Sequence, residues 1–196
     1  MDRTGRQLFM LLLAASAFQG CVSFHAPLEA DDNYPPYWGA MTTLGPNCSS
    51  LDGAYLNEGV ITATNGAIQP VLLTSVLNIR SNARIVSLSV RTRRLDKHGD
   101  AFVSLDVTPD NNVADLRRFD NCFCIKGTLA CPEVSQTSWG VPYVGFGGSQ
   151  NNVYFTLSHD RSLVAKLQNY NIDMALFLIP IFGMDEPWAL FKRAEQ

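Results

Sequence analysis

Apolar and polar residues alternate with a period of two over much of the chain after residue 48. In RIVSLSVRTRR (84–94), Val86, Leu88 and Val90 project to one side, while serines and an arginine project to the other. Runs of this kind, bounded by Asp, Asn and Gly, are typical of β-strands. The pattern predicts strands at 53–61, 84–94, 101–107, 122–131, 141–147, 152–158, 161–168, 173–182 and 187–192.

Polar segments at 96–100, 147–152 and 158–162 are predicted to form turns between these strands. Closely spaced hairpins indicate an antiparallel meander, and about eight strands suffice to build a barrel or a sandwich. We therefore expect a mainly β fold: an antiparallel meander that forms a barrel-like or sandwich domain, with one or two short helices. The helices are expected at 69–78, where leucines and a valine recur at helical spacing, and at 111–119.

The N-terminus has the layout of a secretory signal. Two arginines precede the uncharged stretch LFMLLLAASA (8–17), which is too short for a membrane-spanning helix of about 20 residues. Two cleavage sites compete. Ala15-Ser16-Ala17 fits the general signal peptidase, whereas AFQGC (17–21) resembles a bacterial lipobox, in which Cys21 receives a diacylglycerol.

The cysteine count favours the lipobox. The chain has five cysteines, and an exported protein with an odd number has one that serves another purpose than an internal disulfide. If Cys21 carries lipid, four remain, and these are Cys48, Cys122, Cys124 and Cys131. We therefore expect a lipoprotein signal peptide (1–20), a lipidated tether (21–47) and a β-rich domain (48–196). A secreted soluble protein is the alternative.

Residues 22–47 hold four prolines and no sustained period, which is typical of an extended tether. Some of its aromatic side chains are expected to pack on the domain. No aspartate follows Cys21 directly. By resemblance to Gram-negative lipoproteins, this implies an outer-membrane lipoprotein that faces the periplasm, attached to the membrane through its N-terminal lipid.

The stretch CSSLDGAYLNEG (48–59) resembles the first strand of a group of uncharacterised small Gram-negative lipoproteins, through Gly53, Tyr55, Asn57 and Gly59. Three later stretches resemble other parts of the same group: CIKGTL (124–129), HDRSLVAKL (159–167) and WALFKR (188–193). The chain departs from the group at Asp160-Arg161, where Asp-Gly is usual, and in its extra cysteines at 122 and 131.

More distantly, a G-x-aromatic first strand with a basic last strand resembles the lipocalin and calycin barrels. In such a barrel Gly53 lets the chain turn, and Tyr55 covers the barrel end beside a cation from Lys192 or Arg193. An ordinary strand with a buried tyrosine is the alternative.

Cys122 and Cys124 lie two residues apart on a predicted strand, so they share a face and are poorly placed to bridge each other. One arrangement pairs Cys48 with one of them and Cys131 with the other, although four cysteines allow three connectivities. A C-x-C metal site is the alternative. It lacks a second cysteine pair or a histidine cluster, and an oxidising compartment favours disulfides. We expect no metal and no cofactor.

No catalytic signature emerges from the sequence. The three histidines lie in the tether and in two predicted turns; His159-Asp160 could orient a base, but no nucleophile elbow accompanies it. GFGGSQ (145–150) does not open a helix and so lacks the N-terminus that a phosphate cradle needs. We expect a protein that is not an enzyme.

The net charge is −3, and it becomes −4 once residues 1–20, with two arginines and one aspartate, are removed. This balance gives no basis for nucleic-acid binding. The densest basic patch contains Arg91, Arg93 and Arg94. It is interpreted as an anion or partner site, for lipopolysaccharide phosphates, anionic lipid or an acidic protein, or else as a solvated strand end.

MALFLIPIF (174–182) is the most apolar stretch and is typical of a strand buried on both faces or lining a cavity. These features favour an envelope lipoprotein that binds an apolar small molecule or lipid in a lipocalin-like barrel. Such a cavity would be lined by Phe102, Phe155, Leu176 and Leu178. The alternative is a structural or interaction subunit of an outer-membrane-associated assembly, with a filled core and an apolar surface patch.

Overall fold

The computed structural model describes residues 28–62, 66–95, 100–110, 116–132, 136–139, 146–175 and 179–195. For the strand segments 136–139, 146–151, 169–175 and 179–185 it describes the backbone alone. The expected signal segment, Cys21, Leu176 and Leu178 lie outside the described residues.

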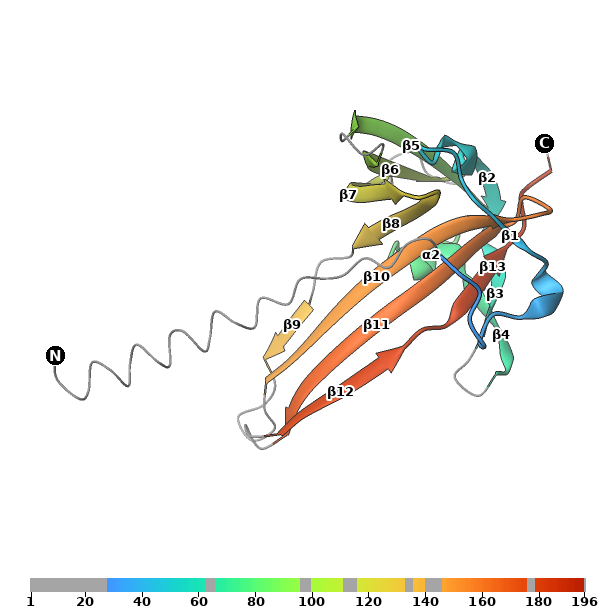
Figure 1. The fold of residues 1–196 in the computed structure, drawn as a ribbon. Helices are drawn as coiled ribbons and strands as arrows, with labels where there is room; N and C mark the ends of the chain where they lie inside the picture. The colour runs from blue at the N-terminus through green and yellow to red at the C-terminus, as the bar shows by residue number, and fades with distance from the viewer. Residues whose placement is uncertain are drawn as a thin grey trace, which may run out of the picture.

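Within these ranges thirteen strands join into one antiparallel sheet, and the helical elements are short (Figure 1). The strands are β1 (Met41–Thr42), β2 (Gly53–Leu56), β3 (Glu58–Thr62), β4 (Ile68–Leu72), β5 (Ile85–Leu95), β6 (Ala101–Pro109), β7 (Arg117–Ile125), β8 (Thr128–Pro132), β9 (Gln136–Trp139), β10 (Phe146–Ser158), β11 (Leu163–Ala175), β12 (Ile179–Asp185) and β13 (Trp188–Phe191). The helical turns are η1 (Pro36–Trp38), η2 (Ser49–Leu51) and α2 (Leu73–Val76). The expected mainly β fold is confirmed.

The sheet follows the order β2-β5-β6-β7-β8-β10-β11-β13-β3-β4 and curls into a half-barrel (Figure 1). Residues that follow β13 join its two halves. The backbone N–H of Leu56 donates to the carbonyl of Lys192 (2.8 Å), and the N–H of Ala194 donates to the carbonyl of Ala54 (2.9 Å). Because β2 pairs on its other flank with β5, these bonds connect the first strands to the last. The architecture is therefore barrel-like.

The clearest period-two runs form strands as predicted. In β5 the side chains of Val86, Leu88 and Val90 are buried. Arg91, which projects from the opposite face of the same strand, is exposed. The strand predicted at 101–107 is β6, and the turn predicted at 158–162 joins β10 to β11. Burial on one side of the sheet explains why alternation was a good guide here.

The helix expected at 69–78 is largely wrong. Residues 68–72 form β4, and only Leu73–Val76 form a helical turn. The helical spacing arises because Leu73, Val76 and Leu77 are all buried from this one turn. Of the helix expected at 111–119, residues 111–115 lie outside the described ranges, and residues 117–119 belong to β7.

Two regions predicted as single strands each cover parts of two strands. The region 122–131 holds the end of β7 and the start of β8, joined at Lys126 and Gly127, which have φ values of 47° and 78°. The region 173–182 holds the end of β11 and the start of β12, which pair with each other. An apolar run therefore covered parts of two strands, because apolar residues alone do not reveal a reversal of the chain.

Other boundaries also differ from the predictions. The residues 147–152, predicted as a turn, lie inside β10, where they pair with β11 and in part with β9. The strand predicted at 53–61 breaks at Asn57 into β2 and β3. Of the strand predicted at 141–147, only residues 146 and 147 are described, and they belong to β10.

Apolar side chains from most of the strands fill the inner side of the half-barrel; the largest include Tyr55, Phe155 and Phe191. Two disulfides lie within this core. Cys48 pairs with Cys124 and Cys122 pairs with Cys131, with Cα–Cα distances of 5.8 and 4.3 Å. The arrangement considered from the sequence is therefore the one that forms, with Cys122 and Cys124 each bonded elsewhere.

Residues 28–42, here called the strap, cross the outer side of the same sheet. The N–H of Leu28 donates to Thr128 Oγ1 (3.1 Å), and at the other end β1 pairs with β10. Between these points Tyr34 and Trp38 pack with Val164 and Trp188 in a second apolar cluster. The aromatic side chains thus pack on the domain as expected, and the chain lies against the sheet from Leu28 onward, well before Cys48.

A charged cluster fixes the first part of the strap. Lys166 Nζ lies 2.6 Å from Asp31 Oδ2 and 2.8 Å from Glu186 Oε2, and only 11% of its side chain is exposed. The indole N–H of Trp188 donates to Asp31 Oδ1 (2.8 Å), and the Lys166 ammonium lies 5.1 Å from the Trp188 ring centroid. Asp31 therefore connects the strap to both β11 and β13.

Candidate binding groove on the outer side of the sheet

Of the four side chains expected to line an interior cavity, the structure describes Phe102 and Phe155, and these two are not brought together. Phe155 is fully buried in the inner core. Phe102 is 42% exposed and contacts Phe123, with ring centroids 4.9 Å apart. Phe102 alternates along β6 with Val103, which belongs to the inner core, so Phe102 and Phe155 lie on opposite sides of the sheet. They do not line one cavity.

A row of side chains runs across the outer side of the sheet, at right angles to the strands. Antiparallel pairing places Thr156 opposite Val164, Val164 opposite Leu190, Leu190 opposite Val60, and Val60 opposite Pro70. Residues directly opposite each other in antiparallel strands project to the same face. The row is therefore continuous from β10, under the strap, to β4 at the end of the sheet.

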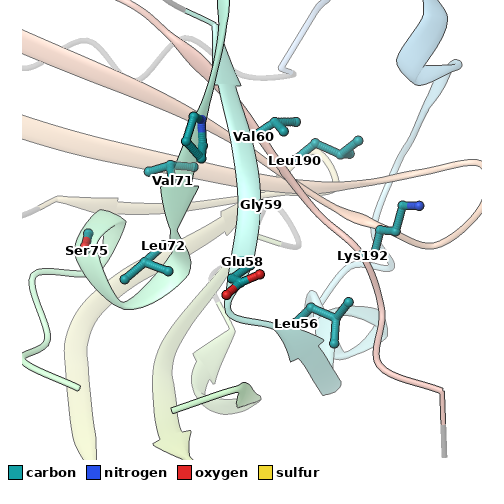
Figure 2. Close-up of a pocket in the computed structure, with 10 residues that line it drawn as sticks. Leu56, Glu58, Gly59, Val60, Val71, Leu72, Ser75, Leu190 and Lys192 are labelled. Atoms are coloured by element: carbon teal, nitrogen blue, oxygen red, sulfur yellow. The ribbon is translucent and has the colours of Figure 1, made fainter. Parts of the chain in front are cut away.

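The strap covers only part of this row. Tyr34 packs edge-on against Trp188 and Trp38, with ring centroids 5.0 and 5.9 Å apart. Beyond these rings a groove of about 630 Å³ opens over β3, β4 and β13 (Figure 2). The groove thus continues the apolar surface on which the strap lies.

The lining of the groove is mostly apolar, with one acidic and one basic side chain. Leu56, Val60, Leu72 and Leu190 supply apolar surface, and Glu58 and Lys192 supply the charges. Figure 2 shows Leu56 and Leu72 on either side of Glu58. Leu56 and Leu72 are 39% and 38% exposed, so the groove is a surface site with two accessible leucines.

A second hollow of about 390 Å³ adjoins the groove. It shares Leu56, Glu58 and Leu72 with the groove and extends to Arg84. Lys192 therefore lines the groove and Arg84 lines the second hollow, with Glu58 common to both. An apolar centre with a mixed charged border is typical of protein-binding surfaces.

Asn57 positions the groove by breaking the first strand. Its buried side chain donates from Nδ2 to the carbonyl of Ala83 and accepts from the N–H of Thr74, each at 2.8 Å. Gly59 follows in β3, where the Phe191 ring lies so close that a Cβ would collide with it. These two residues of the LNEG stretch thus hold β3, α2 and β13 in place around the groove.

The strand β4 ends the path of the described sheet, but it is a poor template for another strand. Pro70 lies at its centre and has no N–H to donate. Proline in an edge strand is one of the ways in which proteins prevent further strand pairing. A molecule in the groove would therefore contact its side chains rather than extend the sheet.

The contact expected between Tyr55 and a C-terminal cation is present. Arg193 Cζ lies 5.8 Å from the Tyr55 ring centroid, and Arg193 Nη2 donates to the Asp52 carbonyl (2.8 Å). The Tyr55 hydroxyl donates to the Leu51 carbonyl (2.9 Å), and burial raises the pKa of Tyr55 to about 12. A Cβ at Gly53 would lie 2.5 Å from Arg193 Nη2, so the glycine makes room for the guanidinium.

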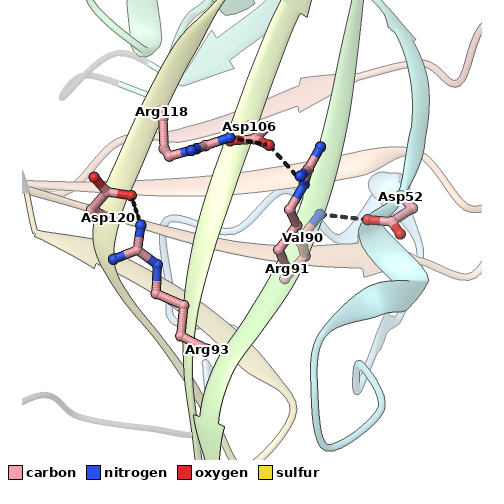
Figure 3. Close-up of polar contacts among 7 residues, drawn as sticks. All are labelled: Asp52, Val90, Arg91, Arg93, Asp106, Arg118 and Asp120. Carbon is pink, nitrogen blue, oxygen red and sulfur yellow. Dashed lines mark hydrogen bonds and ion pairs between the residues drawn. The ribbon is translucent and has the colours of Figure 1, made fainter.

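Arg91 and Arg93 of the basic patch face acidic side chains on neighbouring strands (Figure 3). Asp106 on β6 receives Arg91 from β5 (2.9 Å) and Arg118 from β7 (2.5 Å). The Arg118 hydrogen bond is the main cause that holds the pKa of Asp106 below its usual value, and the positive charges of the arginines add to it. A carboxylate that is ion-paired with two arginines thus occupies the centre of the patch.

The other two arginines also have partners. Arg93 is bonded to Asp120 on β7, and the Arg94 guanidinium carbon lies 5.9 Å from the Phe102 ring centroid. Binding an external anion at Arg91 or Arg93 would compete with these internal carboxylates. The patch therefore has less unpaired positive charge for an external anion than the sequence indicates.

The turn that contains His159 and Asp160 is held by its own hydrogen bonds. Asp160 accepts from the hydroxyls of Ser158 and Ser162. Among the described residues no group of three or more His, Cys, Asp or Glu side chains could hold a metal ion. No helix in the described ranges is long and apolar enough to cross a membrane.

No local pattern in the sequence marked the groove, because its lining comes from residues near 58, 71 and 191. Comparisons with protein-family models, curated protein sequences and solved structures find no match to this chain.

Proposed function

We propose that this chain is an exported, acyl-anchored protein of the cell envelope with a non-catalytic role: its outer groove docks an extended apolar segment of a protein partner. The observation that carries the proposal is the position of the apolar groove. It lies outside a half-barrel whose inner side is filled by Tyr55, Phe155 and other core side chains. A filled core with an apolar surface patch is what an interaction subunit requires.

The sulfur chemistry supports export. All four cysteines of the folded domain are joined in two disulfides, and disulfides persist in oxidising compartments. This pairing leaves Cys21, after an apolar segment of signal length, as the odd cysteine. A lipid on Cys21 accounts for it and places the domain beside a membrane.

The strap supports a protein segment as the occupant. Tyr34 and Trp38 already pack on one half of the outer row, and the groove continues that row through Leu190 and Val60, which are partly buried against the same cluster. A partner segment with two or three apolar side chains would extend the same kind of packing. A basic side chain opposite Glu58 and an acidic one opposite Lys192 would complement the charges of the groove.

The exposure of the groove disfavours a small molecule. Small-molecule sites bury about 70 to 90% of the ligand surface. Here more than a third of the surface of Leu56 and of Leu72 is exposed, so the groove would bury only a small part of a small molecule. A protein segment, in contrast, contributes its own neighbouring surface to exclude water around the contact.

Site-specific photocrosslinking tests the docking site. The full chain is expressed in its native cell with p-benzoylphenylalanine at position 72, or at position 95, where Leu95 is 61% exposed on β5, as the control. We expect one discrete protein adduct from position 72 and none from position 95. Replacement of Leu56, an exposed residue of the groove, by aspartate (Leu56→Asp) should abolish the adduct. A lipid adduct, an adduct to a second copy, or no adduct would overturn the proposal.

Mass spectrometry of the purified mature chain tests the anchor. We expect a chain that begins at Cys21 and carries acyl mass, and a Cys21→Ser variant that lacks this mass and leaves the membrane fraction. A mature chain that begins at Phe18 without acyl mass would overturn the anchoring part of the proposal.

A further inference from the structure

The point where the strap first contacts the sheet limits how far the domain can stand from its anchor. The first described contact is that of Leu28, whose N–H donates to Thr128 Oγ1 (3.1 Å). Asp31, three residues later, is held by Lys166 and Trp188. Residues 28–42 are therefore part of the domain surface and do not lengthen the linker.

Only six residues, 22–27, separate Cys21 from Leu28. At no more than about 3.3–3.6 Å per residue, seven Cα–Cα steps span at most about 25 Å. A folded domain of this length has a radius of gyration of about 15 Å, and so a diameter of about 40 Å. The linker is shorter than the domain is wide, so the domain stays next to the bilayer.

The groove lies on the same side of the sheet as the strap. Thr128 begins β8, and the sheet continues from β8 through β10, β11, β13 and β3 to β4. With neighbouring strands about 4.8 Å apart, the groove is roughly 15 to 25 Å from Thr128 along the sheet. The groove therefore lies within about 50 Å of Cys21, on the side of the sheet to which the linker leads.

We infer that the strap holds the groove at the membrane surface, and that the docked segment is a juxtamembrane segment of a protein anchored in the same membrane. This inference rests on the proposed function. Two partners on one membrane meet at a high effective concentration, so an open groove with few enclosing walls suffices for docking. With a long tether, the domain could instead move away from the bilayer and carry the groove with it.

Linker length tests the inference through the crosslink from position 72. An insertion of 24 Gly and Ser residues between Pro27 and Leu28 should lower the adduct yield about tenfold, because effective concentration falls with linker length. The matched control replaces residues 22–27 by six Gly and Ser residues, which keeps the length, and should leave the yield unchanged.

A second variant lengthens the linker by releasing the strap. Lys166→Met removes the cation that holds Asp31 and Glu186. It should lower the adduct yield in the same direction as the insertion, whereas Arg91→Met, on the outer side of β5, should not.

Neutron reflectometry of the acylated full chain on a supported bilayer gives a readout without the partner. We expect the protein layer to adjoin the headgroups, with a hydrated gap that appears in the insertion variant and in Lys166→Met. A wild-type adduct whose yield is the same in the long-linker variant, or a wide gap in the wild type, overturns this inference and leaves the docking function standing. Absence of any wild-type adduct removes the docking function itself.

Discussion

The guanidinium of Arg193, in the segment after β13, lies over the ring of Tyr55 in β2, with Cζ 5.8 Å from the ring centroid. The same side chain donates to the carbonyl of Asp52 and fills the space that a side chain at Gly53 would occupy. The packing that the sequence motif predicted is therefore present, and it joins β2 to the segment that follows β13.

Gly53→Ala should destabilise the fold by about 1–3 kcal/mol, because its Cβ would meet Arg193 Nη2 and the backbone φ of 156° is unfavourable for alanine. Urea unfolding measures the change. Gly45→Ala, where the nearest side-chain atom is 3.9 Å away, is the control and should stay within about 0.5 kcal/mol. In an Arg193→Ala background the cost of Gly53→Ala should fall; strict additivity would contradict the proposed collision.

The two disulfides should differ in their contribution to stability. Cys48–Cys124 joins residues 76 apart, and Cys122–Cys131 joins residues 9 apart. Loop-closure entropy predicts a cost of about 4–5 kcal/mol for the Cys48→Ala/Cys124→Ala pair and about 2–3 kcal/mol for the Cys122→Ala/Cys131→Ala pair. Urea unfolding of the two double variants tests this order. Equal costs would show that local packing dominates instead.

Lys166→Met should loosen the strap and lower the free energy of unfolding by about 2–3 kcal/mol, because two carboxylates lose their shared cation. Limited proteolysis followed by mass spectrometry should then find new cleavage within residues 28–42. Lys192→Met, on an exposed side chain, is the matched control and should leave the strap resistant. An equally resistant Lys166→Met protein would show that the aromatic contacts suffice.

The stability of the fold should fall in acid partly through Asp106. Arg118 lowers the pKa of Asp106 in the folded state below the usual 3.8, so the unfolded chain takes up this proton first as the pH falls. The contribution is complete above about pH 4–5 and is lost as the pH falls through the lowered value. Asp106→Asn should reduce stability at neutral pH and flatten the dependence below about pH 4.

Urea unfolding at several pH values between about 7 and 2.5 checks this prediction. Asp32→Asn, on an exposed side chain of the strap, is the control and should keep the wild-type profile. An unchanged acid profile in Asp106→Asn would assign the acid sensitivity to other carboxylates.

The strands that the sequence predicted well are those with one buried face and one exposed face. In β5, alternate residues such as Val86 and Leu88 are buried, so the period of two is visible in the letters. In β4 it is not, because Ile68, Gln69, Pro70 and Leu72 are all exposed at the end of the sheet. Without a buried face the period disappears, and the helical spacing of the next turn dominated the prediction.

The strap and the groove could not be predicted for a related reason. The strap has no regular secondary structure over most of its length, and prolines beside aromatic residues are equally typical of a free linker. It is fixed to the sheet by contacts with residues about a hundred or more positions away, among them Thr128, Lys166 and Trp188. Strand geometry, in contrast, predicted that Cys122 and Cys124 do not bridge each other, because they share a face, but it did not decide which of them bonds Cys48.

Backbone bonds from Leu56 to Lys192 and from Ala194 to Ala54 give β2 its second neighbour. This neighbour lies at residues 192–194, so one flank of β2 has no backbone partner until that part of the chain has been synthesised. A chain cut before residue 192 would lack these bonds and the Arg193 guanidinium beside Tyr55. Folding of one of the first strands therefore waits for a segment made much later.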